Sequence, residues 1–274
     1  MSVIEELTGL PAAERLAGRP STVRALLASA AFYVALAVLA LAAWQVAASF
    51  TKPLFLPPPQ LVWEALLGLV RDGSLWQHIL ASYSRILAGW LLGSAVAIPI
   101  GLLLGRSRLM HFLLDPYLQL CRFLPAIALI SLVILWLGTG ESSKIALIMY
   151  ATAFVVAMAT MDGALRVETE KVRAARSLGA TDWQVLWLVV VPATVPQIVT
   201  GMRLAMTNAF MAIVSAEMLA ANEGLGFLIA NSRLFMLTEQ IFVAIVVLGL
   251  LGLATDRAIR IATERLGWRF RVRS

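Results

Sequence analysis

Residues 79–105 read ILASYSRILAGWLLGSAVAIPIGLLLG, and this stretch decides the class of fold. It contains a single charged side chain, that of Arg85. An α-helix needs about 20 consecutive apolar residues to cross the hydrocarbon core of a bilayer, which is about 30 Å thick. The stretch is therefore long enough and apolar enough to form a membrane-spanning helix.

Five further apolar runs of comparable length lie elsewhere in the chain, at residues 25–50, 109–137, 144–162, 195–221 and 240–262. The first is too long for the core of a signal peptide, so we interpret it as a retained helix. The run at 109–137 contains Pro116 and Pro125 and is expected to bend. The sequence thus predicts an all-α, polytopic membrane protein with about six transmembrane helices in a domain spanning residues 25–262.

The composition of the 274-residue chain agrees with a lipid environment, since 60% of its residues are apolar and 14% are charged. Soluble domains contain about 45–50% apolar and about 25% charged residues, so a soluble enzyme, a disordered protein and a secreted disulfide scaffold are all disfavoured. The single cysteine, Cys121, excludes an intrachain disulfide and a cysteine-based metal site. No metal site is expected in this chain.

The distribution of positive charge predicts the orientation in the membrane. Fifteen of the 22 Arg and Lys residues lie in segments on one side of the predicted helices, and four lie on the other side. Because cytoplasmic connections are enriched in Arg and Lys, both termini are expected in the cytoplasm. Residues 1–24 would then form a cytoplasmic segment with a surface helix, and residues 263–274 a basic cytoplasmic tail. The net charge of +6 reflects this orientation and gives no support to nucleic-acid binding.

The outer connection after the first apolar run contains three consecutive prolines, Pro57 to Pro59, which favour an extended segment. Leu61, Ala65, Leu66 and Leu69 then repeat at near-helical spacing. This pattern predicts a short helix lying at the outer membrane interface.

The long cytoplasmic connection at residues 163–194 carries the strongest functional signal. Its first half, 164–178, is charged and helix-forming, and Gly179 suits the left-handed position that ends a helix. Thr181 and Gln184 have the spacing of a capping box, and an apolar face follows at Trp183, Leu186, Trp187 and Val190. The pattern predicts a helix, a glycine break and a short amphipathic helix. That element either projects toward a cytoplasmic partner or rests on the membrane surface.

The residues RAARSLGAT at 173–181, with Val191-Pro192 downstream, resemble the EAA motif of bacterial ABC importer permeases. In that family the motif forms a coupling helix that docks on an ATP-hydrolysing subunit. The resemblance implies that residues 175–190 couple this chain to such a subunit. The implied coupling residues are Arg173, Ala174, Ala175, Arg176, Leu178, Gly179, Ala180, Thr181, Asp182 and Trp183. Arg173 stands where the family has Glu, so a salt bridge assigned to that Glu is not carried over.

Further segments resemble the nitrate, sulfonate and taurine branch of the family, namely Pro53–Gln60, Leu75–His78, Leu114–Pro116, Gly138–Lys144, Ala216–Leu219 and Gly224–Phe227. The resemblance implies a type I ABC importer permease fold in the bacterial inner membrane. It also implies a second copy of the permease, two ATP-binding subunits that hold ATP and Mg, and a periplasmic substrate-binding protein. No cofactor is expected on this chain, and the implied substrate is a small anion such as a sulfonate, taurine or nitrate.

Three arginines lie inside the apolar runs: Arg85, Arg122 and Arg203. A charge at membrane depth costs about 2.5–3.5 kcal/mol on insertion scales, so each should face protein or water. Arg122 either contacts an anionic substrate on the translocation path or satisfies carbonyl groups freed by the prolines. Arg85 and Arg203 either contact substrate or extend toward a membrane face.

Other polar residues in the runs leave similar alternatives open. Glu217 should be paired and is a candidate for the substrate path, as a lock between helices, a gate element or, as a further alternative, a proton-coupling group. Asn208 and Ser215 either line the path or join helices. Two small-residue spacings, Gly89 with Gly93 and Gly101 with Gly105, favour close helix packing without identifying the partner helix.

The sequence contains none of the common catalytic motifs. It lacks a Walker A loop, an HExxH pair and a GxSxG elbow, so the chain is not expected to be an enzyme, and ATP hydrolysis is expected on a partner. A self-contained secondary transporter is the alternative function. It would need ion-coupling carboxylates near the membrane midplane and usually internal repeats, and neither is found. An intramembrane enzyme would need a nucleophile with its base, which is also absent from the pattern.

Overall fold

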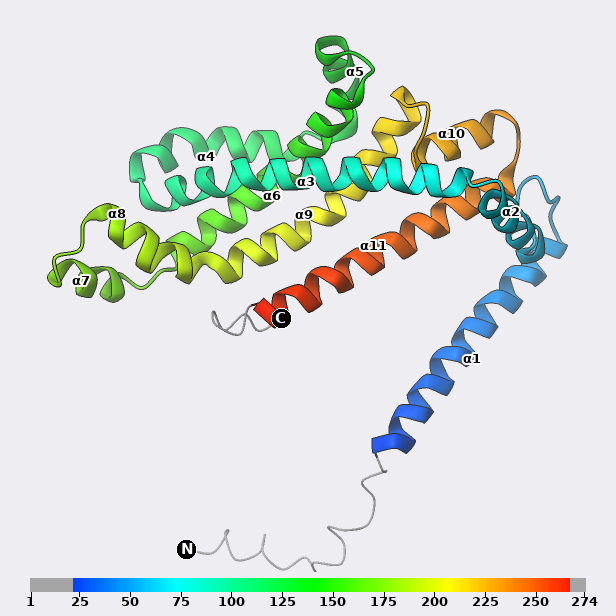
Figure 1. Cartoon of the computed structure of the whole chain (residues 1–274), viewed down its shortest axis with the longest axis horizontal. Coiled ribbons are helices and arrows are strands. Elements are labelled where there is room, and N and C mark those ends of the chain that lie inside the picture. Colours follow the sequence, from blue (N-terminus) through cyan, green and yellow to red (C-terminus); the bar gives the residue numbers. More distant parts are fainter. Residues whose placement is uncertain (1–21, 267–274) are drawn as a thin grey trace, which may run out of the picture. The chain divides into compact units, whose positions relative to one another are not determined.

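The computed structural model describes residues 22–266, and Figure 1 shows its helices. These residues contain no β-strand. Five helices are long and apolar enough to cross a membrane, and a sixth crossing results if the bent pair α4 and α5 forms one span. The predicted all-α architecture with about six membrane helices is therefore confirmed. The surface helix expected in the first twenty residues and the tail from residue 267 onward lie outside the described residues.

The chain divides into two compact units, one ending at Gln60 and one beginning at Leu61. The first unit contains α1 (Thr22–Ser49) and the proline-rich segment after it. In this unit the indole Nε1 of Trp44 donates a hydrogen bond to the carbonyl of Pro57 (3.1 Å). α2 (Pro59–Arg71) begins at the last of the three prolines, where the missing N–H is tolerated, and it is the short helix predicted there from the apolar spacing.

The second unit continues with nine helical elements up to residue 266. These are α3 (Ser74–Arg106), α4 (Arg108–Phe123), α5 (Ala126–Leu137), α6 (Glu141–Leu165), α7 (Thr169–Ser177), α8 (Asp182–Val185), α9 (Val191–Ala220), α10 (Leu225–Leu234) and α11 (Thr238–Leu266), with a π-helical turn, η1 (Leu186–Val190), between α8 and α9. Each long helix coincides with one predicted apolar run.

Helix α6 packs against both α3 and α9, and the glycines of α3 explain how closely it approaches. A Cβ atom added at Gly93 would lie 2.2 Å from Oγ1 of Thr152, and one at Gly101 would lie 2.5 Å from the carbonyl oxygen of Ala157. Only glycine leaves room for the α6 backbone at these positions. The small-residue spacing read from the sequence therefore serves a contact within the chain, between α3 and α6.

The predicted bend occurs between α4 and α5, which meet at an angle of 99°. Its cause is Pro125, which removes a backbone donor and holds Leu124 in an extended conformation (φ −77°, ψ 114°). Pro116 lies inside α4 and does not end it. Of the two prolines in this run, the second makes the break.

The connection at residues 163–194 contains the predicted glycine break and capping box, with two differences. Gly179 has φ +84°, and Thr181 and Gln184 form the reciprocal capping bonds. However, the helix expected over 164–178 is interrupted, because α6 ends at Leu165 and α7 begins at Thr169. The amphipathic helix is also not separate from the fifth span, since α8 continues through η1 into α9. Pro192 is accommodated because it lies in the first turn of α9.

Candidate functional site

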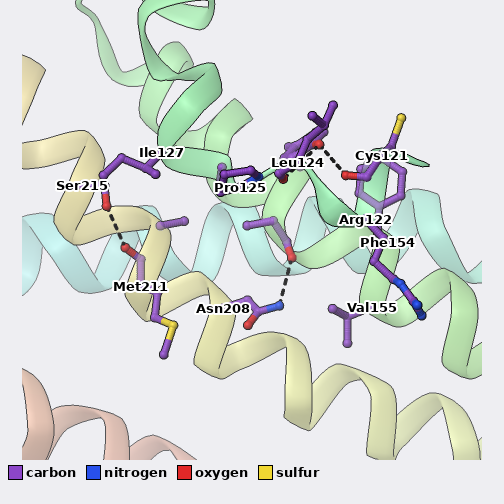
Figure 2. A pocket seen from close by; sticks show the side chains of 14 residues that line it. Cys121, Arg122, Leu124, Pro125, Ile127, Phe154, Val155, Asn208, Met211 and Ser215 are labelled. Carbon is purple, nitrogen blue, oxygen red and sulfur yellow. Dashed lines mark hydrogen bonds between the residues drawn. The ribbon is translucent and has the colours of Figure 1, made fainter. Parts of the chain in front are cut away.

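A cavity of about 370 Å³ lies beside the break between α4 and α5 (Figure 2). The end of α4 contributes Cys121 and Arg122, α6 contributes Tyr150 and Phe154, and α9 contributes a row of side chains that includes Asn208, Met211, Ala212 and Ser215. Three residues proposed from the sequence as path candidates, Arg122, Asn208 and Ser215, therefore line one cavity. The other three, Arg85, Arg203 and Glu217, do not line it.

The break that shapes this cavity is held by a side chain from α6. Pro125 has no N–H to donate to the carbonyl of Cys121, four residues before it. The Tyr150 hydroxyl donates to that carbonyl (2.7 Å) and also lies 3.4 Å from the carbonyl of Leu124. The Cys121 carbonyl, which also accepts from the N–H of Leu124 (3.1 Å), thus has the second partner that Pro125 does not supply, and in a membrane an unsatisfied carbonyl is costly. No motif or spacing in the sequence singles out Tyr150.

Arg122 lies exposed at the end of α4 and lacks a counter-charge. Its Nη1 donates to the thioether sulfur of Met158 (3.5 Å), a weak acceptor, and its guanidinium lies 4.9 Å from the ring centroid of Phe123. No carboxylate within residues 22–266 forms an ion pair with it. The cavity therefore carries an uncompensated positive charge.

Asn208 and Ser215 are the polar side chains that α9 contributes to this cavity, and Figure 2 shows each hydrogen-bonded to a backbone carbonyl. The Asn208 amide donates to the carbonyl of Ala151 at 3.4 Å, and the Ser215 hydroxyl donates to the carbonyl of Met211 at 3.3 Å. Both bonds are long, so both side chains can exchange them for a ligand. The remaining lining is mostly apolar, which is typical of sites for small molecules.

Arg85 is surrounded quite differently, in what we call the ion cluster: Arg85, Glu141, Lys144, Glu217 and Glu223. The Arg85 side chain is only 4% exposed. Its guanidinium forms a bidentate pair with Glu141, with Nη2 to Oε1 at 2.8 Å, and its Nη1 lies 2.8 Å from Oε1 of Glu217. Glu223 adds its backbone carbonyl at 2.8 Å and a carboxylate oxygen at 3.3 Å.

Glu217 fixes the start of α10 as well as Arg85. Its carboxylate accepts from the Ser82 hydroxyl (2.8 Å) and from the N–H of Gly226 (2.9 Å). The N–H of Leu225 donates to the Ser82 oxygen (2.8 Å), so the donors at the start of α10 are satisfied by α3 and α9. Gly224, at φ +120°, leaves no room for a Cβ atom beside this carboxylate. Glu217 is thus paired, as its place in an apolar run required.

Arg203 is also neutralised. Its Nε and Nη2 bind the two carboxylate oxygens of Asp256 on α11 at 2.6 and 2.9 Å. The sequence analysis did not identify Asp256, nor the Glu141 and Glu223 partners of Arg85. The sequence does contain one usable signal. Asp256 lies within the apolar run at 240–262, and a carboxylate in such a run requires a cation nearby.

The segment at residues 173–190 has one buried face and one exposed face. Val185 and Val190 are buried with Leu102 of α3 and Ala164 of α6. Trp183 and Trp187 are exposed and form an edge-to-face pair with centroids 5.5 Å apart. Leu178 is 89% exposed, and Arg176 binds Asp182 (2.8 Å) across the glycine break. Arg173, Ala174, Gly179 and Thr181 are exposed, and Ala175 and Ala180 are half-buried.

Within residues 22–266, no group of three or more His, Cys, Asp or Glu side chains is arranged to hold a metal ion. The chemistry of the described residues is therefore that of ion pairs, an unpaired guanidinium and an exposed aromatic surface.

Comparisons with known proteins agree with this arrangement. The profile of the family described as "Binding-protein-dependent transport system inner membrane component" matches residues 97–268. The chain is 38% identical over 237 residues to the taurine transport system permease protein TauC of Escherichia coli K12, covering 84% of this chain and 86% of that protein. It is 35% identical over 231 residues to the putative aliphatic sulfonates transport permease protein SsuC of the same organism, covering 84% and 88%.

The fold is also found among solved structures. An inward-facing structure of the MetNI methionine ABC transporter superposes with a TM-score of 0.57 at 18% identity, covering 68% of this chain and 95% of that one. Identity at this level supports the fold alone. Together with the family match, it means that the chain belongs to the binding-protein-dependent transport system inner membrane component family and is a multi-pass permease subunit of an ABC importer.

Proposed function

We propose that this subunit passes a small organic sulfonate, such as taurine, from a periplasmic binding protein to the cytoplasm. The cavity beside the α4–α5 break would be a transient binding site on that path. The observation that carries the proposal is the uncompensated Arg122 in a cavity of about 370 Å³ with mostly apolar walls. The names of the relatives TauC and SsuC support the same class of substrate.

The chemistry of the cavity suits a sulfonate. A guanidinium presents parallel N–H donors that match two oxygens of a planar or tetrahedral anion. Asn208 and Ser215 offer further polar contacts, and Phe154 and Ile127 supply apolar surface for a short carbon chain. The alternative role of Arg122, satisfying carbonyls freed by the break, is already filled by Tyr150.

The energy for transport would come from two ATP-binding subunits, which carry ATP and Mg, and the permease would act as a pair of identical copies. We assign the contact with the ATPases to residues 175–190 and the residues flanking them from Arg173. Their exposed aromatic surface fits a protein partner, because exposed Trp and Leu side chains are typical of interaction sites. The buried Val185 and Val190 would transmit movement of this segment to α3 and α6. No cofactor is proposed on this chain.

The proposed location is the bacterial inner membrane, with both termini and residues 163–194 in the cytoplasm. The excess of Arg and Lys on that side supports this orientation. It requires α4 and α5 together to cross the membrane once, which gives six spans. The ion cluster then lies toward the periplasmic side.

Uptake by proteoliposomes that contain the permease, its ATPase and its binding protein tests the proposed substrate path. Arg122→Gln should lower taurine uptake tenfold to a hundredfold, because a hydrogen bond to a charged group contributes about 1.5–3 kcal/mol. Arg122→Lys keeps the positive charge but loses the paired N–H donors of the guanidinium. Its taurine uptake should therefore lie between those of the wild type and Arg122→Gln. Arg260→Gln, which removes an exposed arginine that does not line the cavity, is the control.

Two results would contradict the proposal. One is wild-type taurine uptake by Arg122→Gln, and the other is uptake by the permease without an ATPase, which would indicate a secondary transporter.

The proposed contact between residues 175–190 and the ATPase is tested separately. Gly179→Pro should abolish assembly with the ATPase, because it destroys the left-handed turn before α8. Gly140→Ala, at φ −72° with open space around it, should leave assembly unchanged.

A further inference from the structure

The turn into α10 is attached to the neighbouring helices through three consecutive backbone N–H groups. These bonds run from Gly224 to Nδ1 of His78 (3.0 Å), from Leu225 to Oγ of Ser82 (2.8 Å) and from Gly226 to Oε2 of Glu217 (2.9 Å). His78 and Ser82 are four residues apart on α3, so they lie on one face of that helix. Three of the free donors at the start of α10 are therefore satisfied by side chains of α3 and α9.

The bond from Gly224 fixes the protonation state of His78. A ring nitrogen that accepts a hydrogen bond carries no proton, so the imidazole is in its neutral form with the proton on Nε2. The ring is half-buried and lies beside Phe227 of α10, with 5.9 Å between the ring centroids. The structure therefore shows the turn as a neutral histidine holds it.

Protonation of His78 breaks this bond. An imidazolium has a donor at each nitrogen and no acceptor, so the N–H of Gly224 would face another N–H and lose its partner. The ordinary pKa of a histidine side chain is about 6.5, so a modest fall below neutral pH suffices. Of the other two acceptors, the Ser82 hydroxyl does not titrate, and Glu217 is ion-paired with Arg85.

The charged groups around His78 would draw an imidazolium away from the turn's backbone. Asp72, from the turn before α3, and Glu223, from the turn before α10, both act electrostatically on the ring. Asp72 already accepts from the N–H and the hydroxyl of Ser74, at 2.9 and 2.7 Å. Glu223 is held more loosely, since its carboxylate lies 3.3 Å from Arg85. A proton on His78 therefore weakens two attachments of the turn, the Gly224 N–H and the Glu223 carboxylate.

The turn fits its surroundings too closely to shift gradually. Gly224 has φ +120°, and a Cβ atom there would lie 2.3 Å from the Glu217 carboxylate. Tightly packed contacts of this kind change between discrete arrangements rather than deform continuously. The turn also follows directly on α9, the helix that carries Asn208 and Ser215 of the proposed substrate cavity. Release of the turn would therefore alter the end of the helix on which that cavity is built.

We propose that His78 is a proton-sensitive latch on the turn that carries Glu223 and Gly224. The neutral imidazole holds the turn, and protonation releases it and slows transport. The inference rests on the proposed function in one respect, namely that this end of the bundle faces the compartment from which substrate is taken.

Taurine uptake by proteoliposomes with the permease, its ATPase and its binding protein tests the latch, with the binding-protein side held at about pH 7.5 or about pH 5.5. His78→Asn puts an amide oxygen in place of Nδ1, and this oxygen accepts from Gly224 at either pH. The ratio of wild-type uptake to His78→Asn uptake cancels the pH dependence of the partner proteins. It should be near one at the higher pH and about three- to tenfold lower at the lower pH, as the loss of one hydrogen bond implies.

Two further variants bracket this result. His78→Leu has no acceptor at any pH, so its uptake should be low at both pH values. His111→Asn changes the other histidine of the sequence, which lies on α4, and should follow the wild type at both.

Hydrogen exchange of the amides at residues 224–228 gives a readout that does not depend on the substrate. At about pH 5.5 these amides should exchange faster in the wild type than in His78→Asn, because only the wild type loses the acceptor of Gly224. The two proteins are compared at one pH, so the intrinsic exchange rate is the same in both.

The inference would be overturned by an uptake ratio that is equal at both pH values, which would place any acid sensitivity in Glu217 or in the partner proteins. Full uptake by His78→Leu would overturn it as well, since the acceptor would then be unnecessary. A wild type that takes up no taurine at any pH would refute the proposed function instead. Hydrogen exchange then decides on the latch by itself, and equal exchange in the wild type and His78→Asn would refute it.

Discussion

Two arginines in the membrane-spanning helices of this chain lie in opposite surroundings. Arg85 is buried among Glu141, Glu217 and Glu223, which occupy its donors almost completely. Arg122 lies open beside a helix break, with a thioether and an aromatic ring as its nearest partners. The two were indistinguishable as single charges in apolar runs. The partners decide their roles, because a compensated charge holds helices together and an uncompensated one remains available to a ligand.

The ion cluster and the cavity should therefore respond in opposite ways to the loss of one group. In the cluster, removing Glu217 or Arg85 breaks a buried ion pair, which is costly. In the cavity, removing Arg122 leaves no charge without a partner. The comparison predicts that stability depends on the first region and transport on the second.

The largest effect on stability is expected for Glu217→Gln. The side chain keeps its shape but loses the only buried carboxylate among the described residues that pairs with Arg85, whose remaining partners Glu141 and Glu223 are exposed, and breaking a buried ion pair costs about 3–5 kcal/mol. For a domain of this size that corresponds to a fall of about 10 °C in the unfolding temperature in detergent. Thermal unfolding followed by tryptophan fluorescence or by size exclusion measures it.

Two further variants sharpen this result. Glu64→Gln changes an exposed carboxylate on α2 and should leave the unfolding temperature unchanged. Arg85→Met combined with Glu217→Leu removes both members of the buried Arg85–Glu217 pair and should recover much of the lost stability. An unfolding temperature that stays at the wild-type value in Glu217→Gln would show that the cluster is not a structural clamp.

An intermediate effect is expected for Tyr150→Phe, which acts on the cavity rather than on the cluster. The change removes the hydroxyl that donates to the carbonyl of Cys121, and a hydrogen bond of this kind contributes about 1 kcal/mol. The break between α4 and α5 should loosen, and the unfolding temperature should fall by a few degrees. Tyr117→Phe, on an exposed face of α4, is the control, and an equal fall in both variants would refute the proposed role.

The sequence predicts most of the architecture because membrane helices are encoded locally. Each apolar run, the bend at Pro125 and the capping box at Thr181 depend on residues within a few positions of one another. The structure of the segment at residues 173–190 is predictable for the same reason, since Gly179 and its neighbours form a contiguous pattern. The π-helical turn at Leu186–Val190 is not predictable, because nothing in five apolar residues distinguishes it from an ordinary helical turn.

The pairing of the charges could not be predicted from the sequence, because it depends on helix register. Glu141 is 56 residues from Arg85, and Asp256 is 53 residues from Arg203. Whether Arg85 meets Glu141 depends on how α3 packs against α6 at Gly93 and Gly101. The small-residue spacing in the sequence does not show which helix is the packing partner. Three of the six path candidates thus proved to be neutralised, and only the structure separates them from Arg122, Asn208 and Ser215.

The smallest effect on stability, and the strictest test of the comparison, is expected for Arg122→Gln. Arg122 neutralises no carboxylate within the described residues, so its loss should change the free energy of unfolding by less than about 0.5 kcal/mol. Measured beside Glu217→Gln, it should rank last in lost stability while its taurine uptake falls at least tenfold at equal amounts of folded protein. A large drop in the unfolding temperature of Arg122→Gln would mean that this guanidinium supports the helix break. The two arginines would then differ only in degree, and the cavity would lose the one group that makes it selective for an anion.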